Sequence, residues 1–148
     1  MFRLLLFLLP AASLSALTIS EILPENEGGL QDADLNSPGW IELHNEAALP
    51  VNLAGWSLTD DPLLPKKWEL PAQSLAAGGR LVIFASGKNR AVAGTELHTN
   101  FQLDPDGEYL ALVMPDGVTK PSEFNPFPKL RRNVSWSYAA AAAVTTPV

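Results

Sequence analysis

The amino-acid sequence predicts an all-β protein, a two-sheet sandwich of about nine short strands. From Leu17 onward, apolar residues come in runs of about four to eight bounded by Gly, Pro, Asn and Asp, which is the spacing of strands and turns. The 13 Pro and 10 Gly are scattered between these runs, and a Pro inside a helix removes a backbone donor and clashes with the preceding turn. No stretch of the sequence after Leu17 sustains a helical stripe of apolar side chains.

Two of the expected strands indicate which faces they bury. In one, Leu110, Leu112 and Met114 share a face, as in a strand that is buried on one side. Another, over 81–85, is apolar on both faces, which favours an interior strand covered on both sides. The expected strands are 17–23, 40–45, 51–53, 56–59, 67–70, 80–85, 99–103, 108–114 and 134–138.

Charge and cysteine content exclude several classes of partner and chemistry. The formal net charge is −6 and the pI is near 4.8, so binding to phosphates, which depends on Lys and Arg, is disfavoured and nucleic acid is an unlikely partner. The basic residues Lys129, Arg131 and Arg132, followed by Trp136 and Tyr138, are interpreted as a solvated loop leading into the last strand. The absence of Cys excludes thiol catalysis, thiolate zinc sites, disulfides and a lipid-modified cysteine.

Residues 1–16 are predicted to be a signal peptide. Arg3 is followed by a short apolar run over 4–9 and then by Pro10 and small residues up to Ala16. The run is shorter than the roughly 20 residues that cross a bilayer, and no second candidate follows, so no transmembrane segment is expected. Cleavage is expected after Ser15 or Ala16; the alternative is an N-terminal core strand. The expected location is secreted, periplasmic or at the cell envelope.

The rest of the chain divides into one domain and a tail. Residues 17–138 are expected to form a single β-sandwich domain of ordinary size. Within it, 24–39 is a polar loop longer than most connections, and such loops are often functional or mobile. Residues 139–148, which are rich in alanine and carry no core pattern, are predicted to be a low-complexity tail or linker.

No enzyme motif is present, so the sequence predicts a protein that is not an enzyme and has no cofactor. It lacks a nucleophile elbow, a zinc-protease helix motif and a phosphate-binding loop. His44 and His98 are expected to be surface or hydrogen-bonded imidazoles rather than a base or metal ligands. Glu21 shares a strand face with apolar residues, which predicts a β-bulge, and Glu42 is expected to be exposed. Two carboxylates on neighbouring strands leave acid–base chemistry as the minor alternative.

One segment has the spacing of a calcium ligand set. Asp32, Asp34 and Asn36 present oxygen-bearing side chains at alternate positions, and such side chains can converge on calcium. A complete EF-hand loop would also need Gly and Glu at positions that here hold Ser37 and Leu43. The segment is therefore either a calcium site or a solvated acidic loop.

Five segments in order along the chain resemble the lamin tail domain as found in secreted bacterial proteins. They are 40–45 (WIELHN), 51–60 (VNLAGWSLTD), 81–88 (LVIFASGK), 97–101 (LHTNF) and 107–110 (GEYL). The resemblance runs from about Thr18 to Tyr138. It implies an immunoglobulin-like β-sandwich and a non-catalytic module, with no catalytic residues to carry over. The matching Trp, Leu and Gly positions are mostly core and turn positions.

The leading functional hypothesis is an exported interaction or anchoring module that binds a protein or another envelope or extracellular component. One alternative is an accessory domain or enzyme of metal-assisted hydrolysis, and another is a calcium-dependent carbohydrate-binding module. Trp40 and Trp68 are candidates for binding hot spots if exposed, although strand aromatics are more often buried. The sequence names no ligand and no oligomeric state.

Overall fold

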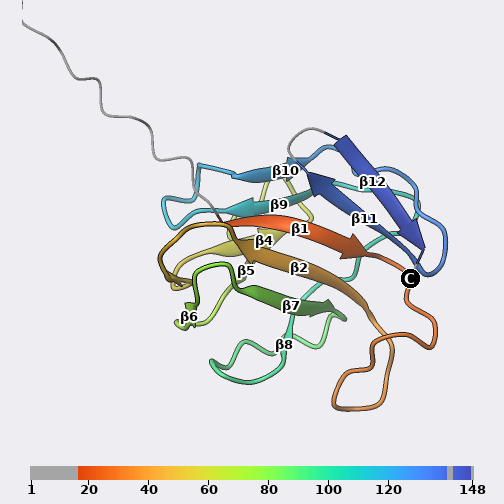
Figure 1. Ribbon diagram of the computed structural model, residues 1–148, viewed down its shortest axis with the longest axis horizontal. Helices are drawn as coiled ribbons and strands as arrows, with labels where there is room; N and C mark the ends of the chain where they lie inside the picture. The colour runs from red at the N-terminus through yellow and green to blue at the C-terminus, as the bar shows by residue number, and fades with distance from the viewer. Residues whose placement is uncertain (1–16, 140–141, 148) are drawn as a thin grey trace, which may run out of the picture.

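The computed structural model describes residues 17–139 and 142–147, which form strands, turns and loops and contain no helix (Figure 1). None of the described segments is therefore a helix long and apolar enough to cross a membrane. The predicted signal peptide, 1–16, lies outside the described residues. The strands are β1 (Leu17–Leu23), β2 (Gly39–Asn45), β3 (Val51–Asn52), β4 (Ser57–Thr59), β5 (Trp68–Glu69), β6 (Ser74–Leu75), β7 (Arg80–Ala85), β8 (Leu97–His98), β9 (Leu110–Val113), β10 (Ser122–Phe124), β11 (Val134–Ala139) and β12 (Ala142–Pro147).

Two sheets make up the two layers of a β-sandwich. The six-stranded sheet has the order β12-β11-β1-β2-β7-β8, and the four-stranded sheet has the order β10-β9-β4-β5. The short pair β3-β6 forms a third, small sheet. Neighbouring strands pair in antiparallel fashion except β7 and β8, which run parallel. The predicted two-sheet all-β architecture is confirmed, and β7 is an interior strand, as its apolar faces indicate.

The core lies between the two sheets, where alternate residues of each strand face inward. Edge-to-face packing joins Phe124 of β10 to Trp136 of β11, with ring centroids 4.8 Å apart. One continuous apolar cluster fills the layer, and its fully buried members are Leu17, Ile19, Ile22, Ile41, Leu43, Leu53, Leu58, Ile83, Leu97, Leu110, Leu112 and Phe127. The aromatic and aliphatic side chains of this cluster therefore hold the two sheets together.

A β-bulge in β1 explains how Glu21 can lie in a strand whose other residues on the same predicted face are apolar. The register with β2 shifts between Ile19 and Glu21, so the predicted bulge is confirmed. The shift leaves Ile19 facing the core and turns Glu21 to the outer face, opposite Glu42. The Ile19 N–H, next to the shift, donates to Ser122 Oγ at 2.9 Å, which ties β1 to β10 of the other sheet. The bulge thus keeps a carboxylate out of the core and adds a hydrogen bond between the sheets.

The strand predicted over 99–103 is wrong. Thr99 donates its hydroxyl to Phe101 O at 2.6 Å, and this local bond competes with a strand ladder. Strand pairing occurs instead two residues earlier, at β8, and only an isolated bridge joins Ser86 to Gln102. The strand predicted over 108–114 is shorter than expected, because the Met114 N–H bonds to Thr119 O in the turn that follows.

The last strand of the chain falls where a tail or linker was expected. Residues Ala142–Pro147 form β12, an antiparallel partner of β11 in the register Val134↔Pro147 to Ala139↔Ala142. In the order β12-β11-β1, β12 takes the edge of β11 on the side away from β1, since the edge of a sheet can pair with any extended segment. Part of the range 139–148 is therefore paired strand, while its assignment outside the domain stays a prediction.

Candidate functional site

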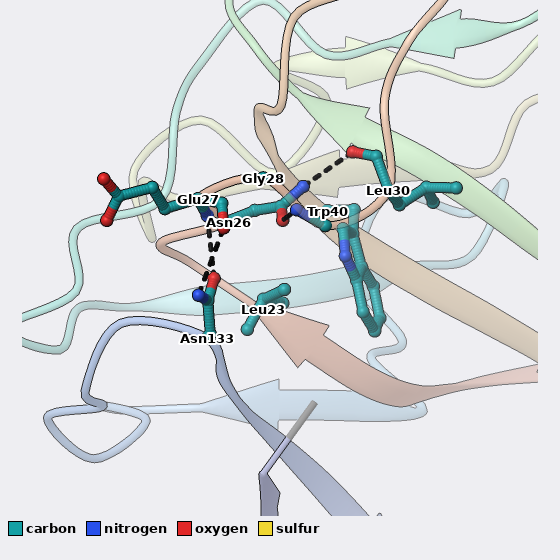
Figure 2. A pocket seen from close by; sticks show the side chains of 8 residues that line it. Leu23, Asn26, Glu27, Gly28, Leu30, Trp40 and Asn133 are labelled. Atoms are coloured by element: carbon teal, nitrogen blue, oxygen red, sulfur yellow. Dashed lines mark hydrogen bonds between the residues drawn. The ribbon is translucent and has the colours of Figure 1, made fainter.

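A pocket of about 260 Å³ opens on the outer face of the six-stranded sheet (Figure 2). Its floor is apolar: Leu23 at the end of β1 and Trp40 near the start of β2 are paired in register and lie side by side. Both belong to a small buried cluster with Phe84, on the face opposite the main core. The residues that line the pocket are Leu23, Asn26, Glu27, Gly28, Gly29, Leu30, Trp40 and Asn133.

One wall of the pocket is the start of the loop that follows β1. The buried Asn26 side chain holds this loop in shape, because its Nδ2 donates to Leu30 O at 2.7 Å and to Pro38 O at 3.1 Å. Its Oδ1 accepts the Gly29 N–H at 3.1 Å, and a Cβ at Gly29 would lie 2.5 Å from that oxygen. Gly28 has a φ of +72°, which other residues rarely adopt. The start of the long polar loop predicted from the sequence is therefore an ordered wall of the pocket, held in shape by the hydrogen bonds of Asn26.

The other wall comes from the opposite end of the chain. Asn133 Oδ1 accepts the Glu27 N–H at 2.7 Å, and its Nδ2 donates to Glu27 O at 3.2 Å. The Arg132 side chain donates to Glu25 at 3.1 Å and pairs with the Glu27 carboxylate. Figure 2 shows that the Glu27 side chain points away from Trp40. The polar groups of these two walls thus bond to each other, and the exposed apolar surface at the pocket is mainly that of Leu30, which is 49% exposed, above the buried Leu23 and Trp40.

A second cluster of functional groups lies further along the same loop, where it meets the segment that joins β7 to β8. We call it the Asp32 cluster; its members are Asp32, Asp34, Ser86, Lys88, Arg90, Glu96 and His98. The Asp32 side chain is fully buried: Oδ1 accepts the N–H groups of Asp34 at 3.0 Å and Asn36 at 2.9 Å, and Oδ2 contacts Lys88 Nζ. Lys88 Nζ also lies 2.7 Å from Asp34 Oδ2, which Arg90 approaches at 2.8 Å.

The ion pairs of this cluster shift the pKa of its charged groups. Burial by itself raises the pKa of Asp32, but hydrogen bonds from Lys88 and from the backbone outweigh it and hold the pKa below its usual value of 3.8. Hydrogen bonds from Lys88 and then Arg90 lower the pKa of Asp34. The two carboxylates in turn raise the pKa of Lys88. All three groups are therefore charged at neutral pH.

The lowered pKa of Asp32 predicts a specific loss of stability in acid. A carboxyl whose pKa is lower in the folded state stabilises the fold above its unfolded pKa, and that contribution disappears as the pH falls through the folded value. As the pH decreases below about 4, we expect the free energy of unfolding of the native sequence to decrease more steeply than that of the Asp32→Asn variant. Urea titrations between pH 2 and pH 7 measure it. Asp106→Asn, an exposed control, should keep the native slope; equal slopes for all three proteins would contradict the prediction.

His98 joins a chain of hydrogen bonds in the same cluster. Its Nδ1 lies 2.8 Å from Ser86 Oγ and its Nε2 lies 2.8 Å from Glu96 Oε1. The imidazole is fully buried and stacks on Phe84, with ring centroids 5.4 Å apart. The order Ser–His–Glu is that of an acid–base relay, but a buried imidazole has no access to substrate, and the pocket beside Trp40 is lined by other residues. His98 is thus a hydrogen-bonded imidazole, and His44 lies partly exposed at 3.8 Å from Glu46.

The structure separates the residues that the calcium prediction grouped. Asp32 is buried and Asp34 faces Lys88 and Arg90, whereas Asn36 bonds to Asp32 through its backbone N–H and its side chain is exposed. The Lys88 ammonium lies between the two carboxylates, where a calcium ion would need to bind. Calcium binding by Asp32, Asp34 and Asn36 stays a prediction.

The other sequence candidates have partners of their own. Glu42, expected to be exposed, has a side chain only 16% accessible and pairs with Arg80 at 2.5 Å, while Glu21 accepts a bond from Ser135. Of the basic residues near the end of the chain, Lys129 forms an ion pair with Asp106, and Arg132 forms one with Glu25. The candidate hot spots Trp40 and Trp68 are both buried.

Sequence reasoning missed the pocket and most of the Asp32 cluster. Asn26 and Asn133 are 107 positions apart and meet only because β11 pairs with β1. A local signal did exist for the cluster, since Glu96, just before β8, and His98, within it, are two positions apart, the spacing that places side chains on one face of an extended segment.

Comparison with known protein families identifies the family of this chain. The family model described as Lamin Tail Domain matches residues 10–121, more than half of the chain. The family has an immunoglobulin-like fold, so the predicted immunoglobulin-like β-sandwich is confirmed. No curated protein and no solved structure matches the chain significantly.

Proposed function

Because the chain belongs to the lamin tail domain family, we propose that it is an exported interaction module that binds a protein of the cell envelope or the extracellular space. The family is generally non-enzymatic, which supports binding rather than catalysis. Export is supported by Arg3, the apolar run over 4–9 and the small residues that follow. The pocket beside Trp40 is the observation that carries the proposal.

The size and lining of this pocket suit one apolar side chain of a partner. Drug-sized ligands occupy pockets of roughly 300 to 1,000 Å³, and this one holds about 260 Å³. Leu23 and Trp40 form its floor, and Leu30, whose surface is 49% exposed, stands at its mouth. Binding energy at protein interfaces concentrates where an apolar anchor enters such a pocket inside a polar rim. Here the polar residues around the floor are Asn26, Glu27 and Asn133.

The alternatives fit this surface less well. A saccharide subsite needs polar side chains that are free to bond to hydroxyl groups, but the amides of Asn26 and Asn133 already bond to the loop. Metal-assisted hydrolysis needs an accessible metal next to a substrate cleft, whereas the pocket floor carries no carboxylate or imidazole. We therefore place the partner's anchor residue, and not a sugar or scissile bond, in the pocket.

A peptide selection tests the proposal. We expect the chain from Leu17 onward to enrich, from a random library displayed on phage, peptides that share one Leu, Phe or Trp anchor. Leu30→Asp, which adds a carboxylate at the mouth, should weaken their binding tenfold or more, with little effect on folding because Leu30 is half exposed. Isothermal titration gives the affinities, and the Trp40 indole N–H resonance should shift on binding.

The control is the same substitution at Leu63, an 85% exposed leucine that lines a different pocket, of about 680 Å³, with Leu64 and Lys67. Leu63→Asp should leave peptide binding unchanged. Peptides that respond to Leu63→Asp and not to Leu30→Asp would move the binding site to the β4–β5 loop, and a library that yields no enriched peptide would count against an anchor pocket altogether.

A further inference from the structure

We propose that Asp32, Glu96 and His98 form a zinc site. One ligand atom from each of the three side chains lies within 4.8 Å of those of the other two. Two of the three side chains, Asp32 and His98, are fully buried, so they are presented in fixed positions. The site shares no residue with the pocket beside Trp40, and the inference stands independently of the proposed function.

The surroundings of His98 are those of a metal-binding imidazole. Ligating histidines usually bond through their second ring nitrogen to an oxygen that fixes the ring, and here Nδ1 lies 2.8 Å from Ser86 Oγ. Stacking on Phe84 restrains the ring further. Nε2 is the nitrogen that faces Glu96. Since a carboxylate only accepts, neutral His98 carries its proton on Nε2 when no metal is bound, and Ser86 then donates to Nδ1.

Zinc would reverse this tautomer without a net change in protons. The metal needs the lone pair of Nε2, so the proton would reside on Nδ1 and be donated to Ser86 Oγ. A hydroxyl suits both states because it donates and accepts. The other contact of the Ser86 hydroxyl, with the Lys88 backbone N–H at 3.1 Å, uses one lone pair of the oxygen and leaves this exchange open.

The two carboxylates are held by the backbone in positions that leave oxygens for a metal. Asp32 Oδ1 accepts two backbone N–H groups, while Oδ2 has the Lys88 side chain as its partner. Glu96 accepts the Ala33 N–H at 3.0 Å through Oε1 and 3.2 Å through Oε2. Zinc accepts both imidazole nitrogen and carboxylate oxygen, and three protein ligands leave its fourth tetrahedral position open. Calcium prefers six to eight oxygens, which the three side chains do not provide.

Lys88 is the internal competitor for this site. Its ammonium neutralises Asp32, and it also contacts Asp34, so it can give up the first carboxylate and keep the second. Its side chain is 24% accessible, which gives the ammonium a path toward solvent. In the cluster, three carboxylates face only the two basic groups Lys88 and Arg90, so a dication is electrostatically acceptable.

Nuclear magnetic resonance with zinc chloride tests the site directly. The sequence has two histidines, so a long-range ¹H–¹⁵N spectrum of the untagged chain contains two imidazoles, and partly exposed His44 is the internal control. We expect zinc to convert His98 from the Nε2–H to the Nδ1–H tautomer and to leave His44 unchanged. A response of His44 alone would overturn the proposal.

Zinc affinities of variants give a second, independent readout. Lys88→Gln removes the competing cation and should tighten zinc binding on the order of tenfold, whereas Lys129→Gln, an exposed lysine paired with Asp106, should not. Glu96→Gln, at a partly exposed ligand, should weaken binding at least about tenfold. Equal affinities for the native chain, Lys88→Gln and Glu96→Gln would overturn the site, and their folding is checked by circular dichroism.

Discussion

Asn45→Asp should destabilise the protein by on the order of 4 kcal/mol, a large part of the roughly 5–15 kcal/mol that holds a domain folded. Asn45 is buried at the end of β2, where its Nδ2 donates to Leu49 O at 2.9 Å, Leu75 O at 3.2 Å and Ala76 O at 3.0 Å. An aspartate of the same shape has no donor there, so a carboxylate would face three carbonyl oxygens away from water. Urea unfolding followed by tryptophan fluorescence measures the loss.

The same substitution at Asn52 is a matched control. Both asparagines accept a backbone N–H two residues ahead through Oδ1, Asn45 from Ala47 and Asn52 from Ala54. Both changes add one negative charge, but Asn52 is exposed and aspartate serves its turn equally well. We expect Asn52→Asp to change stability by less than about 0.5 kcal/mol. Equal losses at the two positions would show that added charge, and not the buried donor, sets the cost.

The strands that could be predicted from the sequence are those long enough to show a pattern of apolar side chains. Strands 17–23 and 80–85 were predicted with the bounds the structure gives, because each is a run of apolar and β-branched residues ended by turn residues. The two- and three-residue strands β6 and β10 were missed, since so few residues carry no periodicity. Their pairing is set by the partner strands, which a single segment does not reveal.

The candidate sites were predictable only in part, for a related reason. Asp32 stood out because acidic side chains alternate around it, but its partner Lys88 is 56 positions away and the pairing depends on how two loops meet. The bulge at Glu21 was predictable because a carboxylate among core residues is costly. The pocket wall needs Asn133 in a left-handed conformation, with φ at +57°, next to a loop more than 100 positions earlier, and no local pattern encodes that contact.

Phe127→Ala should cost about 3–5 kcal/mol, the usual loss for a buried phenylalanine. Phe127 is fully buried in the main core although it lies in a loop, and its N–H donates to Glu108 O at 3.0 Å. Urea unfolding measured by near-ultraviolet circular dichroism and by fluorescence should give one coincident transition at lower urea. Val118→Ala, at a side chain 76% exposed within the family match, should change stability by less than about 0.5 kcal/mol.

The burial of Phe127 also bears on where the folded domain ends along the chain. The family match stops at 121, yet the core cluster continues through Phe124, Phe127, Leu130 and Trp136, and β11 pairs directly with β1. If these residues belong to one cooperative unit, a chain that ends after 121 exposes the core face of β1 and should show no cooperative unfolding. A truncated chain that kept a native near-ultraviolet spectrum, together with a loss below about 1 kcal/mol in Phe127→Ala, would instead place 122–139 outside the folding unit.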